Sequence, residues 1–133
     1  MEFGLFCGGY VPKALSDANP DAEHDRIMSE LRLCEVADQN HWKYAWFTEH
    51  HFLTEYSHIS ANEVLMPYLA GRTEQIHVGS GIINVTPPVN HPARVAERVA
   101  MLDGLSKGRF EFGVGRGSSS TEQRGFGKAG YGV

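Results

Sequence analysis

The sequence has few cysteines, no excess of positive charge and no long hydrophobic run. Its two cysteines, Cys7 and Cys34, form no CxxC motif and cannot build a disulfide framework. With 12 Lys and Arg against 16 Asp and Glu, the net charge of −4 argues against nucleic-acid binding through a basic face. No apolar run approaches the roughly 20 residues that span a bilayer. The N-terminus lacks the features of a secretory signal, so we expect a cytoplasmic protein with reduced thiols.

The composition is that of an ordinary folded domain. The 133 residues are 41% hydrophobic and 21% charged, which excludes a disordered or low-complexity chain. The counts of 15 glycines and 7 histidines stand out. The positions of these residues therefore matter more than the overall composition.

Short apolar runs alternate with stretches of helical periodicity. The expected strands are 2–7, 44–48, 76–85 and 110–114, and the expected helices are 20–40, 61–70 and 92–106. Asn19-Pro20 provides an N-cap and a first helical position, Ser60 and Glu63 suit a capping box, and His91-Pro92 begins the last helix. The β-α-β-α-β-α-β order predicts an α/β fold with parallel strands and right-handed crossovers.

Polar residues gather just after the predicted strands. The residues at these positions are Glu49, His50 and His51 after the second strand, Ser80, Gly81 and Asn84 in the third, and Arg116 with Ser118–Ser120 after the fourth. Sites in parallel α/β folds form at the C-terminal ends of strands. We therefore expect the three groups to share one pocket.

The sequence Glu49-His50-His51 allows three interpretations. Because neighbouring residues of a strand point in opposite directions, His50 and His51 do not both face one site without a bend. We favour one histidine as an acid/base group or substrate contact, since imidazole titrates near neutral pH. A metal site formed by Glu49, one of these histidines and His58 is the second interpretation. The third is a pair of hydrogen-bonded histidines with a structural role.

Two glycine-containing segments indicate close approach to a ligand. Gly113–Ser118 resembles a GxGxxG motif without its last glycine, and no helix is expected to follow it. Its backbone N–H groups, Arg116 and the serines suit a phosphate, and a flexible turn is the alternative. Gly79-Ser80-Gly81 within a strand would let a flat ring approach, and a bulge or tight packing is the alternative.

A set of motifs in a fixed order resembles the bacterial luciferase-like flavin monooxygenase family. The resemblance covers about residues 1–127 and rests on several segments. These are Thr48-Glu49-His50-His51-Phe52, Gly71-Arg72-Thr73, Val78-Gly79-Ser80-Gly81, His91-Pro92-Ala93-Arg94, Leu102-Asp103, Leu105-Ser106-Lys107-Gly108-Arg109-Phe110 and Phe112-Gly113-Val114-Gly115-Arg116-Gly117.

The resemblance implies a TIM barrel that binds reduced FMN, or a deazaflavin coenzyme, at the strand C-termini. Flavin would come from a separate reductase and, with oxygen, would oxidise an aldehyde or another small organic substrate. By this resemblance His50 is the acid/base residue, and no metal is implied. The other implied site residues are Glu49, Ser80, Gly81, Gly115 and Arg116 for the cofactor, with Arg116 at its phosphate, and His51 and Asn84 for the substrate or as support. The Ser80–Gly81 peptide is a candidate cis bond.

The length is short for this fold, because a TIM barrel has eight βα units and about 250 residues. We expect residues 1–124 to form the first four units, as half a barrel, and residues 125–133 to be an irregular Gly-rich tail. An open sheet invites pairing, so we expect homo-oligomers. The face that should close the barrel is apolar, and its candidates, some pointing inward and some outward, are Phe3, Leu5, Phe47, Val78, Ile82, Phe110 and Phe112. The two functions left open are a flavin-dependent monooxygenase and a non-catalytic self-associating fragment.

Overall fold

Parallel strands form one layer of the molecule and helices form the other. The computed structural model describes residues 1–127. The main sheet has the order β1-β2-β3-β5, and a two-stranded parallel sheet pairs β4 with β6. The strands are β1 (Gly4–Cys7), β2 (Tyr44–Phe47), β3 (His77–Ser80), β4 (Ile83–Asn84), β5 (Phe110–Glu111) and β6 (Val114–Gly115). All pairs are parallel, as predicted.

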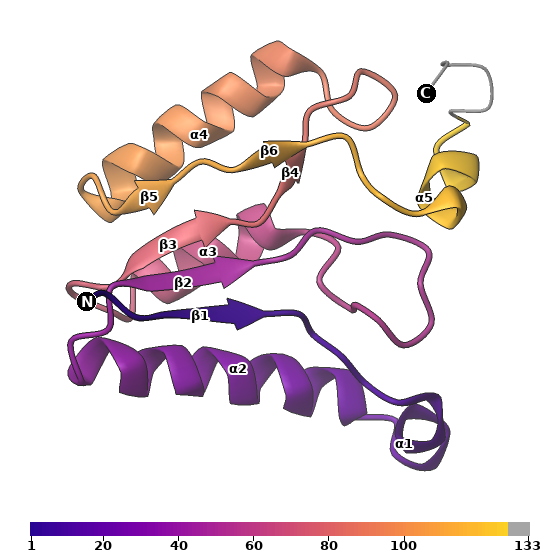
Figure 1. Ribbon diagram of the computed structural model, residues 1–133, viewed down its shortest axis with the longest axis horizontal. Coiled ribbons are helices and arrows are strands. Elements are labelled where there is room, and N and C mark those ends of the chain that lie inside the picture. Colours follow the sequence, from indigo (N-terminus) through magenta and orange to yellow (C-terminus); the bar gives the residue numbers. More distant parts are fainter. Residues whose placement is uncertain (128–133) are drawn as a thin grey trace.

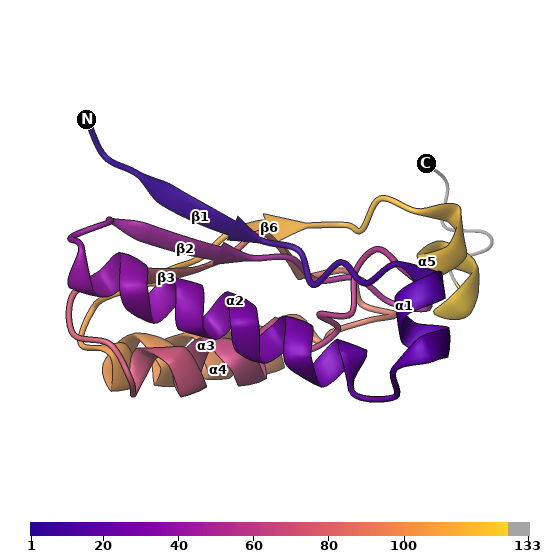
Figure 2. The same ribbon diagram turned by 90° about the horizontal axis from the view of Figure 1, so that it is seen from below.

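Helices cover one face of the main sheet, and Figure 2 shows them along a single side. The helices are α1 (Lys13–Ala18), α2 (Ala22–Gln39), α3 (Asn62–Ala70), α4 (Pro92–Ser106) and α5 (Ser120–Gly125). Helix α5 lies beyond the C-terminal ends of the strands (Figure 1). The polar residues after β2, β4 and β6 therefore meet at the same end of the molecule as α5.

The hydrophobic core lies between the sheet and α2, α3 and α4. It uses alternate strand residues, because successive side chains of a strand point to opposite faces. The buried members on the strands are Cys7, Ala45, Phe47 and Val78, and those on the helices include Leu31, Cys34, Met66, Leu69, Val95 and Leu102. The two cysteine sulfurs lie 3.6 Å apart. The hydrogen bond from Cys34 and burial raise the pKa of the Cys7 thiol, so Cys7 is an unreactive core residue.

The other face of β1, β2 and β3 carries no helix among residues 1–127 (Figure 2). Phe6 on this face has 66% of its surface exposed, and Trp46 packs over Gly79. Of the candidates for the apolar face, Leu5 and Phe110 pack against the core, and Phe47 and Val78 belong to it. Both are buried against the helices, because side chains alternate along a strand and those of Phe47 and Val78 point to the face opposite that of Phe6 and Trp46.

The third and fourth predicted strands are each broken into two. The peptide between Gly81 and Ile82 is cis and separates β3 from β4, so the cis bond lies one residue later than predicted. A second cis peptide joins Tyr56 and Ser57. Between β5 and β6, a Cβ on Gly113 would lie 2.1 Å from the Ser80 carbonyl oxygen. The backbones therefore approach so closely here that only glycine fits.

Several helix boundaries differ from the prediction. Helix α1 was not expected, since its six residues are too few to show a period, and none of them is buried. Helix α2 begins at Ala22 rather than Pro20, because the Asn19 side chain accepts a hydrogen bond from the Asp21 amide and forms a turn before the helix. The capping box expected at Ser60 is absent, and the N-cap of α3 is Ala61.

The C-terminal end of the described region also differs from the prediction. A helix, α5, follows the Arg116 segment, and it begins with a capping box between Ser119 and Glu122. Gly125, predicted to open an irregular tail, is the last residue of this helix. The remainder of that predicted tail, residues 128–133, lies outside the described residues.

Candidate functional site

A cavity of about 310 Å³ lies at the C-terminal ends of the parallel strands. It is lined by Glu49, His50, Gly81, Ile82, Gly115, Arg116, Gly117 and Ser118. The lining comes from the loop after β2, the bend between β3 and β4, and the segment that begins at the end of β6. Five of the predicted site residues thus meet in one cavity, although they come from three distant segments.

Glycines let the chain run close to neighbouring side chains at one wall of the cavity. A Cβ on Gly115 would lie 3.0 Å from the Ile82 side chain. Gly117 has a φ of +77°, and a Cβ there would lie 2.9 Å from the Asn84 amide nitrogen. The wall therefore presents backbone beside the Arg116 guanidinium and the Ser118 hydroxyl, a donor set that suits an anion.

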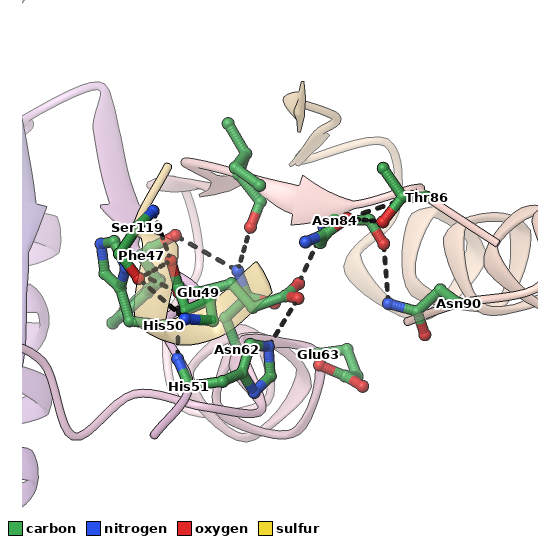
Figure 3. A network of polar contacts seen from close by, with 12 residues as sticks. Phe47, Glu49, His50, His51, Asn62, Glu63, Asn84, Thr86, Asn90 and Ser119 are labelled. Atoms are coloured by element: carbon green, nitrogen blue, oxygen red, sulfur yellow. Dashed lines mark hydrogen bonds and ion pairs between the residues drawn. The ribbon is translucent and has the colours of Figure 1, made fainter. Parts of the chain in front are cut away.

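His50 and His51 are held by two different carboxylates (Figure 3). His50 Nδ1 lies 3.0 Å from Glu122 Oε1, and His51 Nε2 lies 2.9 Å from Glu49 Oε1. Glu49 is 6% exposed, and its Oε2 also accepts a hydrogen bond from the backbone amide of Asn84 at 3.0 Å. Of the two histidines, His50 lines the cavity, whereas His51 is directed to Glu49 and to the ring of Phe126.

Glu122 is a buried residue of the site that the sequence did not reveal. It is 2% exposed. Its Oε2 accepts hydrogen bonds from the backbone amide of Ser119 at 3.0 Å and from the Ser119 hydroxyl at 2.7 Å. Its Oε1 accepts a hydrogen bond from the backbone amide of His51 at 3.1 Å. Burial alone would raise the pKa of this carboxyl. The hydrogen bonds from Ser119, His51 and His50 outweigh burial and lower the pKa to about 2.

Ser80 and Asn84 lie beside the cavity and support its walls. Ser80 is fully buried, and its hydroxyl donates to the Gly113 carbonyl at 2.8 Å and accepts the Gly113 amide at 2.9 Å. The Asn84 side-chain oxygen accepts the Thr86 amide and hydroxyl. Neither residue lines the cavity, so their predicted contacts with a cofactor or substrate stay predictions.

Asn62 is a second residue that the sequence did not reveal. Its side chain is fully buried and donates to the Phe47 carbonyl at 3.3 Å and the Ile82 carbonyl at 2.9 Å. Asn62 therefore ties the end of β2 to the bend that forms one wall of the cavity (Figure 3).

The SxxE spacing of Ser119 and Glu122 is a signal for the start of α5, but no sequence signal pairs Glu122 with His50.

The three histidines considered for a metal site each contact a different carboxylate. His50 contacts Glu122, His51 contacts Glu49, and His58 Nδ1 lies 3.0 Å from Glu23. Within residues 1–127, no group of three or more His, Cys, Asp or Glu side chains is arranged to hold a metal ion.

The order of the motifs matches a known family. A family model described as luciferase-like monooxygenase matches residues 1–130. The chain belongs to this family. Among curated luciferase-like relatives, the alkanal monooxygenase alpha chain of Photorhabdus laumondii is 35% identical over 128 residues, which are 96% of this chain and 33% of the relative. The chain therefore spans about a third of the length of the curated relatives that it matches.

Solved structures of luciferase-like proteins share the fold. A monooxygenase from Streptomyces bottropensis has a TM-score of 0.80 and 26% identity, over 96% of this chain and 36% of that one. The oxygenating constituent of 3,6-diketocamphane monooxygenase from Pseudomonas putida, in complex with FMN, has a TM-score of 0.79 and 22% identity, over 96% and 32% of the chains. These similarities confirm the fold class as α/β of the TIM-barrel type.

A deazaflavin-dependent protein is similar as well. The coenzyme F420-dependent tetrahydromethanopterin reductase of Methanopyrus kandleri has a TM-score of 0.65 and 26% identity, over 95% of this chain and 30% of that chain. The family thus includes proteins with FMN and proteins with F420.

No helix in the described part of this luciferase-like chain is long and apolar enough to cross a membrane.

Proposed function

We propose that this chain forms part of the flavin site of a flavin-dependent monooxygenase. The observation that carries the proposal is the cavity at the strand C-termini, where Glu49, His50, Gly81, Gly115 and Arg116 meet. In parallel α/β folds this end of the strands is where ligands bind. Membership of the luciferase-like monooxygenase family gives the same reaction class.

The residues present fit a flavin phosphate at one wall of the cavity. Arg116 supplies a guanidinium fork, and Ser118 adds a hydroxyl donor to the same lining. Gly81 lines the same cavity and carries no side chain that could block a flat ring, and a Cβ there would lie 3.1 Å from the Phe6 ring. Bound reduced flavin would supply the electrons for the reaction with oxygen.

The protein's own contribution to the chemistry is to place donors and one imidazole around that ligand. Arg116 would hold the phosphate, and the backbone near Glu49 and Gly81 would contact the ring. We assign proton transfer at the cavity to His50, because it is the imidazole among the lining residues. We assign His51, Ser80 and Asn84 to holding these groups in place or to contacts with the substrate.

We propose FMN as the cofactor, with a deazaflavin coenzyme as the alternative, since the names of related structures include both. The protein would be cytoplasmic, and a separate flavin reductase would supply the reduced form. An aldehyde or another small organic molecule would be the substrate, as the name alkanal monooxygenase of the similar chain suggests.

A second function is supported by the uncovered face of the sheet. Phe6 is 66% exposed there and Phe112, near the edge strand β5, is 47% exposed. Such surfaces and open strand edges favour association. The alternative is thus a self-associating protein that keeps the motifs without turnover.

Flavin titration separates the two functions. We expect reduced FMN to bind only weakly to the chain, and expect Arg116→Ala to weaken that binding further by about 10-fold or more, since a hydrogen bond to a charged group contributes about 1.5–3 kcal/mol. Arg94→Ala is the matched control, because Arg94 lies on α4 with 70% of its side chain exposed. Absence of binding up to millimolar FMN and F420, or equal binding by both variants, would reject the flavin site and favour the alternative.

A further inference from the structure

Glu122 joins two segments that lie far apart in the sequence. Its Oε2 accepts the amide and hydroxyl of Ser119, which begins α5, and its Oε1 accepts His50 Nδ1 and the His51 amide. His50 and Glu122 are separated by 72 positions. One oxygen of the carboxylate therefore caps the helix, and the other is committed to the histidine loop.

The charge state of Glu122 determines which partner donates the hydrogen bond. Its pKa of about 2 means that the carboxyl is ionised at neutral pH. An ionised carboxylate can only accept hydrogen bonds. His50 Nδ1 must therefore carry a hydrogen, at a distance of 3.0 Å from Glu122 Oε1.

The other ring nitrogen of His50 follows from this constraint. In a neutral imidazole one nitrogen carries the hydrogen and the other carries a lone pair. If Nδ1–H points to Glu122, Nε2 is the acceptor. His50 lines the cavity, and within residues 1–127 the hydrogen bond to Glu122 engages Nδ1 and leaves Nε2 for a ligand.

The neighbouring histidine is held the other way round. His51 Nε2 lies 2.9 Å from Glu49 Oε1, so His51 donates from Nε2. Glu49 in turn accepts a hydrogen bond from the backbone amide of Asn84 at 3.0 Å, and this bond orients the carboxylate. Two adjacent histidines thus have opposite tautomers, each selected by its own buried glutamate.

We infer that Glu122 is a positioning residue that holds His50 as the Nδ1–H tautomer and so presents an unprotonated Nε2 to the cavity. In the proposed monooxygenase, which this role presupposes, Nε2 accepts a proton from a group bound in the cavity. The positive charge that the ring then gains lies next to the Glu122 carboxylate. Glu122 itself does not line the cavity, so it acts through His50.

The test is a two-bond ¹H–¹⁵N correlation spectrum of the histidine rings in the full chain at pH 8, without flavin. We expect His50 to carry its hydrogen on Nδ1 and His51 on Nε2. The two histidines serve as internal references for each other. An Nε2–H tautomer at His50 in the unmodified chain would overturn the inference, whatever the result of flavin titration, so the two proposals fail independently.

Variants separate positioning from a merely structural role. Glu122→Gln loses one of the two acceptor oxygens, so the side chain no longer forces a hydrogen onto Nδ1, and we expect the Nε2–H form of His50 to become populated. Ser119→Ala removes the cap of α5 but keeps the carboxylate, so His50 should remain Nδ1–H. Glu23→Gln, at the His58 pair, is the matched control and should leave the His50 ring signals unchanged.

Two results with the variants would contradict the inference. The first is a folded Glu122→Gln chain in which His50 stays Nδ1–H. The second is a Ser119→Ala chain in which the tautomer changes as it does in Glu122→Gln, since this would trace the effect to α5 rather than to the carboxylate. If Glu122→Gln fails to fold, the spectra of the unmodified and Ser119→Ala chains still decide the question.

Discussion

Two adjacent histidines of this chain have different surroundings, and the difference decides which of them reaches the cavity. His50 lines the cavity, while His51 turns to Glu49 and Phe126. The alternation of side chains along a strand end predicted that they would separate. It did not predict the partner of His50, because Glu122 lies 72 positions away and only the folded chain brings the two together.

The buried Glu122 carboxylate should make stability depend on acid pH. Its pKa is about 2 in the folded chain against an ordinary value of 4.5. A lowered folded pKa adds stability above the ordinary pKa, and that stability is lost as the pH falls from about 4.5 towards 2. The difference corresponds to about 3 kcal/mol. Urea unfolding between pH 7 and pH 2.5 should show the loss, and Glu122→Gln should show a flatter profile.

Glu23→Gln is the control for this measurement, since the Glu23 side chain is 59% exposed. It should keep the pH profile of the unmodified chain. Identical profiles for Glu122→Gln and the unmodified chain would show that the Glu122 hydrogen bonds do not contribute to the free energy of unfolding.

Helices and strands were predictable where the signal is local. His91 and Pro92 begin α4 as predicted, with the His91 side chain accepting the Ala93 amide. The parallel order followed from the alternation of strand and helix patterns. The strand breaks were not predictable, because the bend at Gly81-Ile82 is held by the distant side chain of Asn62. Gly81 and Ile82 line the cavity together with residues of two other segments, so its shape also depends on contacts that lie far apart in sequence.

The close approach of the segment after β5 to β3 predicts a large difference between two Gly→Ala substitutions. In Gly113→Ala the new Cβ would lie 2.1 Å from the Ser80 carbonyl oxygen, and we expect a loss of about 1–3 kcal/mol in unfolding free energy. A Cβ on Gly104, within α4, would meet no neighbouring atom of residues 1–127 within 4 Å. Gly104→Ala should therefore stabilise the chain by about 0.5–1 kcal/mol.

Urea unfolding at neutral pH measures both substitutions. Far-UV circular dichroism shows whether Gly113→Ala keeps its secondary structure. If Gly113→Ala were as stable as the unmodified chain, β3 and the Gly113 segment would have to lie further apart than the structure places them.

As a whole, the molecule has one layer of helices and one exposed layer of strands. The buried core residues of the main sheet, Cys7, Ala45, Phe47 and Val78, belong to one cluster with residues of α2, α3 and α4. A closed TIM barrel would cover the inner face of such a sheet with further strands. For the chain on its own, this face is the surface through which we expect self-association.

Sedimentation velocity tests that expectation. The chain should sediment as a dimer or larger species at micromolar concentration, and Phe6→Lys should shift it towards the monomer. Leu105→Lys is the matched control, because Leu105 lies on α4 in the helix layer and is 64% exposed, close to the 66% of Phe6. A compact monomer for the unmodified chain, or equal shifts for the two variants, would contradict the prediction.

The bond between Glu122 and His50 also sets the order in which the site is completed during synthesis. The main sheet is complete once β5 has formed, at Glu111. The carboxylate that orients the imidazole is added 11 residues later, at position 122. A nascent chain thus has its strands and both histidines before it has the group that sets the His50 tautomer. A cut between Arg116 and Ser119 would leave every residue of the main sheet on one fragment and put Glu122 on the other, so the sheet and the His50–Glu122 contact differ in their vulnerability to cleavage.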